Sequence, residues 1–298
     1  MLVWGLDFSV LKWALAAMHP HVANALRFTV SAGVLGTVYG LRCWWTGTSV
    51  LAPIRTSWES IVPLGLLGFG AFPASLMVGL NHTTAGSAAL IMATNPLWTA
   101  VLGWALGTER LGRGGWGGLV VALIGASLVI AAGGTAGGGT LFGNGTMLVA
   151  ALLWGSYTAL TKQLVDRTSV LPTTFFGVLG ALPVLLAVGA VFEPTVAWGA
   201  VDGWAVGSLL FSGGLAVGRM FVLWNQGVRR IGSSNTAVYY YLVPVVALVA
   251  GVVLLDEPIT LMQVAGGRAH HWRPHASAAV EIAGRPGRRG RPRNANPL

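Results

Sequence analysis

The sequence predicts an all-α membrane protein built as an inverted repeat of two five-helix halves. Three observations lead to this fold class: the composition, the regular recurrence of apolar stretches, and matching motifs about 150 residues apart. Hydrophobic residues make up 54% of the 298-residue chain and charged residues 9%, whereas soluble domains carry about 25% charged residues. Because so few charges cannot cover a water-exposed surface, most of the chain is expected to contact the lipid bilayer.

Nine apolar stretches are long enough to cross a bilayer, which takes about 20 residues. They cover residues 2–18, 22–44, 60–80, 85–107, 114–132, 144–164, 171–192, 203–226 and 233–255. A tenth stretch begins at Ile259 and is interrupted at Arg268, because arginine at the bilayer centre costs at least about 2.5 kcal/mol. We therefore expect nine complete helices and a disrupted tenth.

Among the connections between these stretches, only the even-numbered ones carry lysine or arginine at or near them. These residues are Arg42, Arg55, Arg110, Arg113, Lys162, Arg167, Arg229 and Arg230. The odd-numbered connections contain no basic residue and include four acidic ones, Glu193, Asp202, Asp256 and Glu257. Basic residues are enriched in cytoplasmic loops. The pattern predicts a multi-pass protein of the cell membrane, inner or plasma, with a cytoplasmic N-terminus.

Two motifs recur in both halves of the chain. Each half contains a Trp-Gly pair with a lysine eight residues after the tryptophan: Trp4, Gly5 and Lys12, then Trp154, Gly155 and Lys162. Each half also contains a proline with a glutamate thirteen residues later: Pro96 and Glu109, then Pro244 and Glu257. Since five helices per half is an odd number, the second half must enter the membrane from the opposite face. Such inverted repeats are typical of transporters, and a purely structural bundle is the alternative.

Together these motifs resemble the EamA branch of the drug/metabolite transporter superfamily. The resemblance rests on the W-G-x-x-F pattern that begins at Trp4, on Arg27-Phe28, on the two mid-helix prolines, and on the L-x-E-P pattern that begins at Leu255. It covers residues 2–267 and implies ten helices, cytoplasmic termini and a central cavity lined by helices one to four and six to nine. It also implies movement of small metabolites or toxic compounds. The leading hypothesis is a secondary transporter that exports small metabolites or amino acids by alternating access.

The chain divides into a first repeat at 1–133, a second at 144–267 and a basic tail at 268–298. Seven of the eighteen basic residues lie in this tail, so the net charge of +9 does not indicate a nucleic-acid partner. Arginine and proline without periodicity are what a shifted reading frame of a GC-rich gene gives, and a frameshift would make the protein a non-functional remnant. A genuine disordered basic tail is the alternative.

Polar and aromatic residues inside the spans are the candidates for a substrate pathway, because such groups usually face a cavity or a partner. The polar candidates are Asp7, Lys12, Arg27, Asn95, Arg219 and Asn225, and the aromatic candidates are Trp4, Phe8, Trp98, Trp154, Tyr157, Tyr239 and Tyr240. An aromatic cavity suits flat apolar or cationic ligands. For Asp7 the alternative is an internal salt bridge with Arg27 or Arg219.

Pro96 and Pro244 are predicted to lie within helices, where each removes a backbone hydrogen bond and permits a kink. Their matching positions suggest paired hinges, with static bends as the alternative. The sequence contains no H-E-x-x-H, G-x-S-x-G or P-loop motif, and Cys43 is its single cysteine. We therefore expect no catalytic site, metal or cofactor, and a membrane enzyme is the less favoured class. Small-residue spacings leave a homodimer open.

Overall fold

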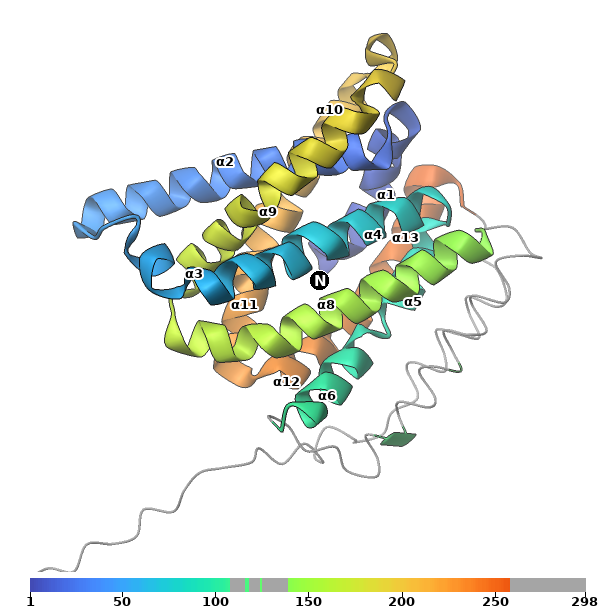
Figure 1. Cartoon of the computed structure of the whole chain (residues 1–298). Helices are drawn as coiled ribbons and strands as arrows, with labels where there is room; N and C mark the ends of the chain where they lie inside the picture. The colour runs from blue at the N-terminus through green and yellow to red at the C-terminus, as the bar shows by residue number, and fades with distance from the viewer. Residues whose placement is uncertain (108–115, 118–123, 125–138, 258–298) are drawn as a thin grey trace, which may run out of the picture.

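The computed structural model describes residues 1–107, 116–117, 124 and 139–257, which form a bundle of helices (Figure 1). Within these residues an isolated bridge between Thr83 and Gly139 is the one strand-like pairing. Most of the predicted fifth span, Glu109, the predicted tenth helix and the tail lie outside the described residues.

The first half contains α1 (Leu2–Ala17), α2 (Pro20–Thr46), α3 (Ala52–Gly65), the π-helical segment η1 (Leu66–Ala71), α4 (Phe72–Asn81), α5 (Ala85–Met92) and α6 (Asn95–Ala105). The second contains α8 (Leu141–Arg167), α9 (Val170–Phe192), η2 (Glu193–Thr195), η3 (Trp198–Ala200), α10 (Gly203–Leu210), the π-helical segment η4 (Phe211–Arg219), α11 (Met220–Ile231), α12 (Ser233–Val238), η5 (Tyr239–Tyr241) and α13 (Leu242–Leu255).

Five of the described helical stretches are long and apolar enough to cross a membrane: Ala52–Asn81, Ala85–Ala105, Val170–Thr195, Gly203–Ile231 and Ser233–Leu255. Bulky apolar side chains cover the outside of the bundle, as the exposed Leu186, Val191 and Val253 illustrate. In water such a surface would be unfavourable, whereas in lipid it is the expected one. The chain is a multi-pass membrane protein.

Helix boundaries follow local capping signals. The side chains of Thr84, Thr140 and Asp202 accept hydrogen bonds from the first turns of α5, α8 and α10, as residues before a helix commonly do. The helix of the third span extends beyond the predicted residues 60–80: α3 begins at Ala52 and is kinked at Ser57. Pro53 lies in the first turn of α3, where a helix does not need its missing N–H.

Reciprocal contacts relate the two halves. α1 packs on α13, and its counterpart α8 packs on α6. A β carbon on Gly5 would lie 2.5 Å from the Cβ of Val246, and one on Gly155 would lie 2.6 Å from the Cβ of Trp98. Val246 and Trp98 occupy matching positions, because each lies two residues after a repeat proline. The Trp-Gly glycine therefore allows the same close helix contact in both halves.

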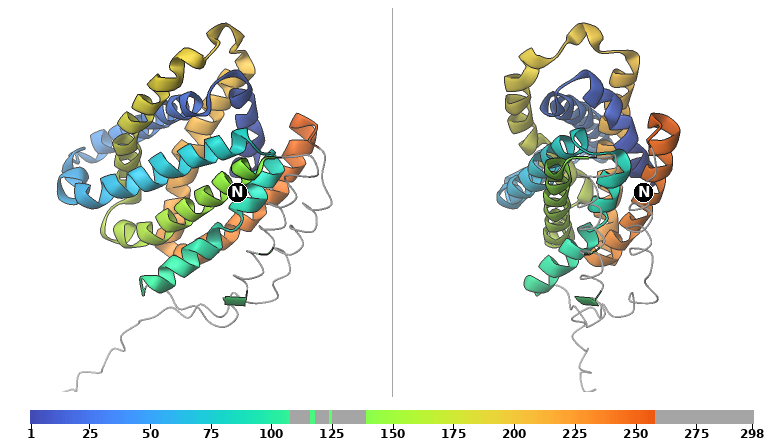
Figure 2. Two further views of the ribbon diagram at one scale, coloured as in Figure 1. Left: turned by 45° about the vertical axis from the view of Figure 1, so that its right-hand side comes forward. Right: turned by 90° about the vertical axis from the view of Figure 1, so that its right-hand side faces the viewer.

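The matching helices run in opposite directions, which confirms the inverted repeat. Lys12, towards the C-terminal end of α1, donates to the carbonyl of Thr83. Thr83 Oγ1 in turn donates at 2.6 Å to Oδ1 of Asn144, which lies near the start of α8. At the other end of the bundle, Lys162 Nζ near the end of α8 donates to the carbonyl of Arg229 at 3.1 Å. We call these ends the Lys12 face and the Lys162 face; the helices between them can be followed in Figure 2.

Both fourth spans are broken at mid-length. Residues 93–94 separate α5 from α6, and the 3-10 turn η5 separates α12 from α13. Pro96 and Pro244 lie just after these interruptions, in the first turns of α6 and α13. Each proline is therefore inside its membrane-spanning stretch, Ala85–Ala105 or Ser233–Leu255. Their action as hinges stays a prediction.

Candidate binding cavity

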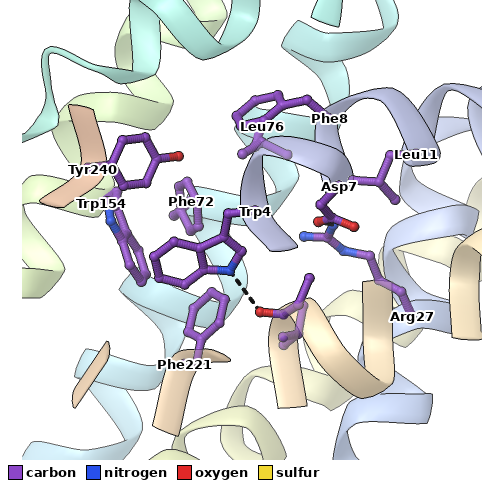
Figure 3. Close-up of a pocket in the computed structure, with 12 residues that line it drawn as sticks. Trp4, Asp7, Phe8, Leu11, Arg27, Phe72, Leu76, Trp154, Phe221 and Tyr240 are labelled. Carbon is purple, nitrogen blue, oxygen red and sulfur yellow. Dashed lines mark hydrogen bonds and ion pairs between the residues drawn. The ribbon is translucent and has the colours of Figure 1, made fainter. Parts of the chain in front are cut away.

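A small buried cavity of about 40 Å³ lies at the centre of the bundle (Figure 3). Its walls come from both halves, because α1, α2 and α4 meet α8, η4, α11 and η5 there. A cavity needs about 10–15 Å³ of such volume to hold a water molecule, so this one has room for water. The cavity has one charged side and one aromatic side, with Trp4 between them.

The charged side consists of Asp7 on α1 and Arg27 on α2, joined through Ser212 of η4. Arg27 Nη1 donates to Ser212 Oγ at 3.1 Å, and Ser212 Oγ donates to Asp7 Oδ2 at 3.1 Å. The direct separation between Arg27 Nη1 and Asp7 Oδ2 is 3.8 Å. Arg27 Nε also donates to Asn24 Oδ1 at 3.1 Å. The arginine is therefore held on two sides by neutral groups as well as by the carboxylate.

Both charges are almost fully buried: Asp7 is 8% exposed and Arg27 3%. Taking ions out of water is expensive unless each is paired and hydrogen-bonded. The second carboxylate oxygen, Asp7 Oδ1, is buried without any hydrogen-bond donor. An acceptor of this kind on a residue that lines a cavity is suited to bind a donor group of a ligand.

The aromatic side surrounds Trp4 and Trp154, whose rings meet edge to face at 5.7 Å. Phe72 and Phe221 lie 4.8 and 4.9 Å from the Trp154 ring, and Tyr240 lies 5.9 Å from Trp4. All of these rings are buried. Edge-to-face and tilted pairs at these distances are favourable, so this side presents ring faces and edges to an apolar group.

The comparisons with known proteins match both halves separately. The model of the EamA-like transporter family matches residues 1–131 and 141–268. The chain belongs to the EamA-like transporter family. The two matched segments coincide with the two halves of the inverted repeat, so each half is one EamA domain.

Relatives match over most of their length. The chain is 29% identical to the uncharacterized transporter YyaM of Bacillus subtilis, covering 88% of this chain and 85% of YyaM. It is 29% identical to the probable terminal-alkyne amino-acid exporter of Streptantibioticus cattleyicolor, with 89% of each chain covered. It is 28% identical to the probable amino-acid metabolite efflux pump of Salmonella typhimurium, covering 89% and 88%. A solved crystal structure superposes with a TM-score of 0.67 at 21% identity, covering 90% and 91%, which shows the shared fold.

The sequence candidates divide between the EamA cavity and its surroundings. Six of them line the cavity: Trp4, Asp7, Phe8, Arg27, Trp154 and Tyr240. Tyr157 stacks behind Trp154 at 5.2 Å and accepts a hydrogen bond from Asn225 at 2.8 Å. Tyr239 is exposed, whereas Tyr240 beside it is buried.

The remaining candidates are not among the residues that line the cavity. Asn95 is fully buried at the start of α6, and both polar atoms of its side chain are without a partner. Trp98 donates to Thr94 one turn earlier at 3.3 Å. Arg219 is exposed at the end of η4 and is not among the residues that line the cavity, so its role in the pathway stays a prediction.

Sequence reasoning missed Ser212, Phe72 and Phe221. A serine or phenylalanine in an apolar span is too common to be noticed alone. The signal that exists is positional: Ser212 lies within Phe211–Arg219 and Phe72 directly follows Leu66–Ala71, and these are the glycine-rich π-helical segments of the two matching spans. Among the described residues, no group of three His, Cys, Asp or Glu side chains is placed to hold a metal ion.

Proposed function

We propose that this EamA protein is a secondary transporter that exports amino acids or small metabolites by alternating access. The observation that carries the proposal is the two-sided cavity, with an acid and a base on one side and aromatic rings on the other. A zwitterionic amino acid presents the same division. Its ammonium group would bind Asp7 Oδ1, its carboxylate would bind Arg27, and an apolar side chain would pack on Trp154 and Phe221.

Alternating access is supported by the size of the cavity. Sites for small ligands measure about 300–1,000 Å³, far more than the 40 Å³ found here. A substrate therefore requires the aromatic side and the charged side to separate. An inverted repeat supports this movement, because its two halves can exchange conformations between opposite-facing states.

The relatives support an exporter over an importer or an enzyme. Two of them are named as a probable amino-acid exporter and a probable amino-acid metabolite efflux pump. For this chain we propose the same direction. The distribution of basic residues predicts that the Lys162 face is cytoplasmic, so export would run from the Lys162 face to the Lys12 face.

Transport into proteoliposomes tests the function directly. We expect the purified protein to move a radiolabelled aromatic amino acid, and we expect Asp7→Asn and Arg27→Gln each to reduce the rate more than tenfold, because a charge-assisted hydrogen bond contributes about 1.5–3 kcal/mol. Glu193→Gln, on an exposed loop residue, is the matched control and should leave the rate unchanged.

Competing compounds separate the two halves of the recognition. The amide of the amino acid lacks the carboxylate, and the deaminated acid lacks the ammonium group, so each should compete at least tenfold less well than the amino acid itself. Equal competition by all three compounds would refute zwitterion recognition. Absence of transport for every amino acid and dye offered would refute the transporter.

A further inference from the structure

The equivalent tryptophans of the two halves differ in their hydrogen bonds. Trp4 Nε1 donates to the carbonyl of Ala216 in η4 at 2.9 Å. Trp154 Nε1 is buried and has no acceptor, and the whole residue is only 1% exposed. A buried donor without an acceptor is unfavourable. The unpaired N–H of Trp154 therefore needs a physical explanation.

The acceptor of Trp4 exists because η4 is π-helical. In such a segment hydrogen bonds span five residues in place of four. At its end the N–H of Met220 bonds to the carbonyls of Leu215 and Val217 and not to that of Ala216. The Ala216 carbonyl accepts no bond from Met220, and the indole of Trp4 donates to it.

The first half contains the matching carbonyl. Gly68 in η1 corresponds to Ala216 by the repeat offset of 148 residues. The N–H of Phe72 bonds to Leu67, and the residue five positions after Gly68 is Pro73, which has no N–H to donate. Proline thus denies the Gly68 carbonyl its π-helical donor.

Trp154 is connected to η1 through the rings next to it, those of Phe72 and Tyr157. Its ring is 4.8 Å from that of Phe72, and the ring of Tyr157, one turn further along α8, lies directly against Gly68. A β carbon at Gly68 would overlap the tyrosine ring, so α8 approaches η1 as closely as the backbone allows.

We propose that the two tryptophans form an alternating latch. In the present conformation Trp4 holds the Ala216 carbonyl and Trp154 is unpaired. In the opposite-facing conformation Trp154 donates to the Gly68 carbonyl and Trp4 releases Ala216. This inference rests on the proposed alternating-access function and names the groups that hold each state.

The latch accounts for two states of similar free energy. Each state makes one indole hydrogen bond and leaves one indole N–H buried and unpaired, so the unfavourable contributions match. A transporter needs such a balance, because a state favoured by several kcal/mol would be the only one populated.

Distance measurements without substrate test the latch. Tryptophan to phenylalanine removes the N–H and keeps an aromatic ring. In a Cys43→Ala background, spin labels at His82 and Thr195 report the Lys12 face, and labels at Thr48 and Asn235 report the Lys162 face; all four positions are exposed. We expect Trp4→Phe to lower the population of the present conformation by about threefold to tenfold, the range that one hydrogen bond supports.

The companion variants determine the outcome. Trp154→Phe should raise the population of the present conformation, and the double variant should return towards the wild-type ratio. The control is Trp224→Phe, whose N–H donates to Thr158 at 3.2 Å within the second half; it should leave the ratio unchanged. Shifts in the same direction for Trp4→Phe and Trp154→Phe would overturn the latch.

Two further outcomes separate the latch from the transport proposal. If Trp154→Phe weakens substrate binding without moving the distances, its N–H is a substrate contact and the latch is wrong. If opposite shifts occur in a protein that transports nothing, the latch stands and the proposed function fails.

Discussion

Asp7 has a neutral counterpart in the second half. The Trp-Gly motifs lie 150 residues apart, so Asp7 corresponds to Tyr157. Asn225 Nδ2 donates to Tyr157 Oη at 2.8 Å and to Thr174 Oγ1 at 3.0 Å, so the counterpart of the buried carboxylate lies in a neutral network. The two halves therefore differ in charge at this matching position.

The buried pair predicts a non-additive effect on stability. Arg27→Met leaves the Asp7 carboxylate buried without its cation, and loss of one partner from a buried pair costs about 3–5 kcal/mol. The double variant Asp7→Asn/Arg27→Met should be more stable than Arg27→Met alone, because no charge is left buried. Thermal unfolding in detergent measures this; a double variant less stable than both single variants would contradict it.

The exposed position of Arg219 shows where sequence reasoning stops at the residue scale. Seven residues separate Ser212 from Arg219, which in an α-helix is close to two turns and places both on one face. A π-helical turn holds more residues, so by Arg219 the side chains have rotated away from the cavity. The pairing of Asp7 with Arg27 was predictable as one of two alternatives, whereas the bridging Ser212 was not.

At the scale of helices, composition and the repeat predicted the spans well, and the interruptions poorly. The span 233–255 has the predicted ends, and α9 begins one residue before the prediction. The breaks before Pro96 and Pro244 and the segments η1 and η4 were not predicted. Hydropathy responds to burial in lipid, and these interruptions change hydrogen-bond register without changing apolar content.

Close helix contact at Gly5 predicts opposite effects of one substitution at two glycines. Gly5→Ala places a β carbon 2.5 Å from Val246 Cβ, and such overpacking costs about 1–3 kcal/mol. Gly33→Ala is the matched control on α2, because a β carbon there meets no atom within 4 Å; it should gain about 0.5–1 kcal/mol from helix propensity. Unfolding midpoints in detergent compare them, and a stable Gly5→Ala protein would refute the contact.

Across the whole molecule, Glu257 connects both halves at the Lys12 face. Its Oε1 accepts from the N–H of Ala85 at 3.0 Å and its Oε2 from that of Gly86 at 3.4 Å, capping α5 from the end of α13. A carboxylate at a helix N-terminus is favourable because it balances the helix dipole. α13 is thereby fixed to α5, next to the point where Lys12 of α1 binds Thr83.

Removing this cap should loosen one face of the bundle only. We expect Glu257→Gln to raise amide hydrogen exchange in the first turn of α5 about fivefold, because a cap contributes about 1 kcal/mol. The control is Asp166→Asn, which removes the exposed pair with Lys162 (2.9 Å) on the opposite face, where surface pairs contribute about 0–1 kcal/mol. Unchanged exchange in α5 would show that Glu257 does not hold this face.

The internal neutrality of the Asp7–Arg27 pair has an electrical consequence. The described cavity walls carry one negative and one positive side chain, and a zwitterion also carries no net charge. In the proposed cycle, neither the loaded nor the empty cavity moves charge across the membrane. A potential of 100 mV does about 2.3 kcal/mol of work on each elementary charge that crosses the membrane. It does no work on a cavity that carries no net charge. The substrate gradient, or a co-transported ion bound elsewhere, must then set the direction of flow.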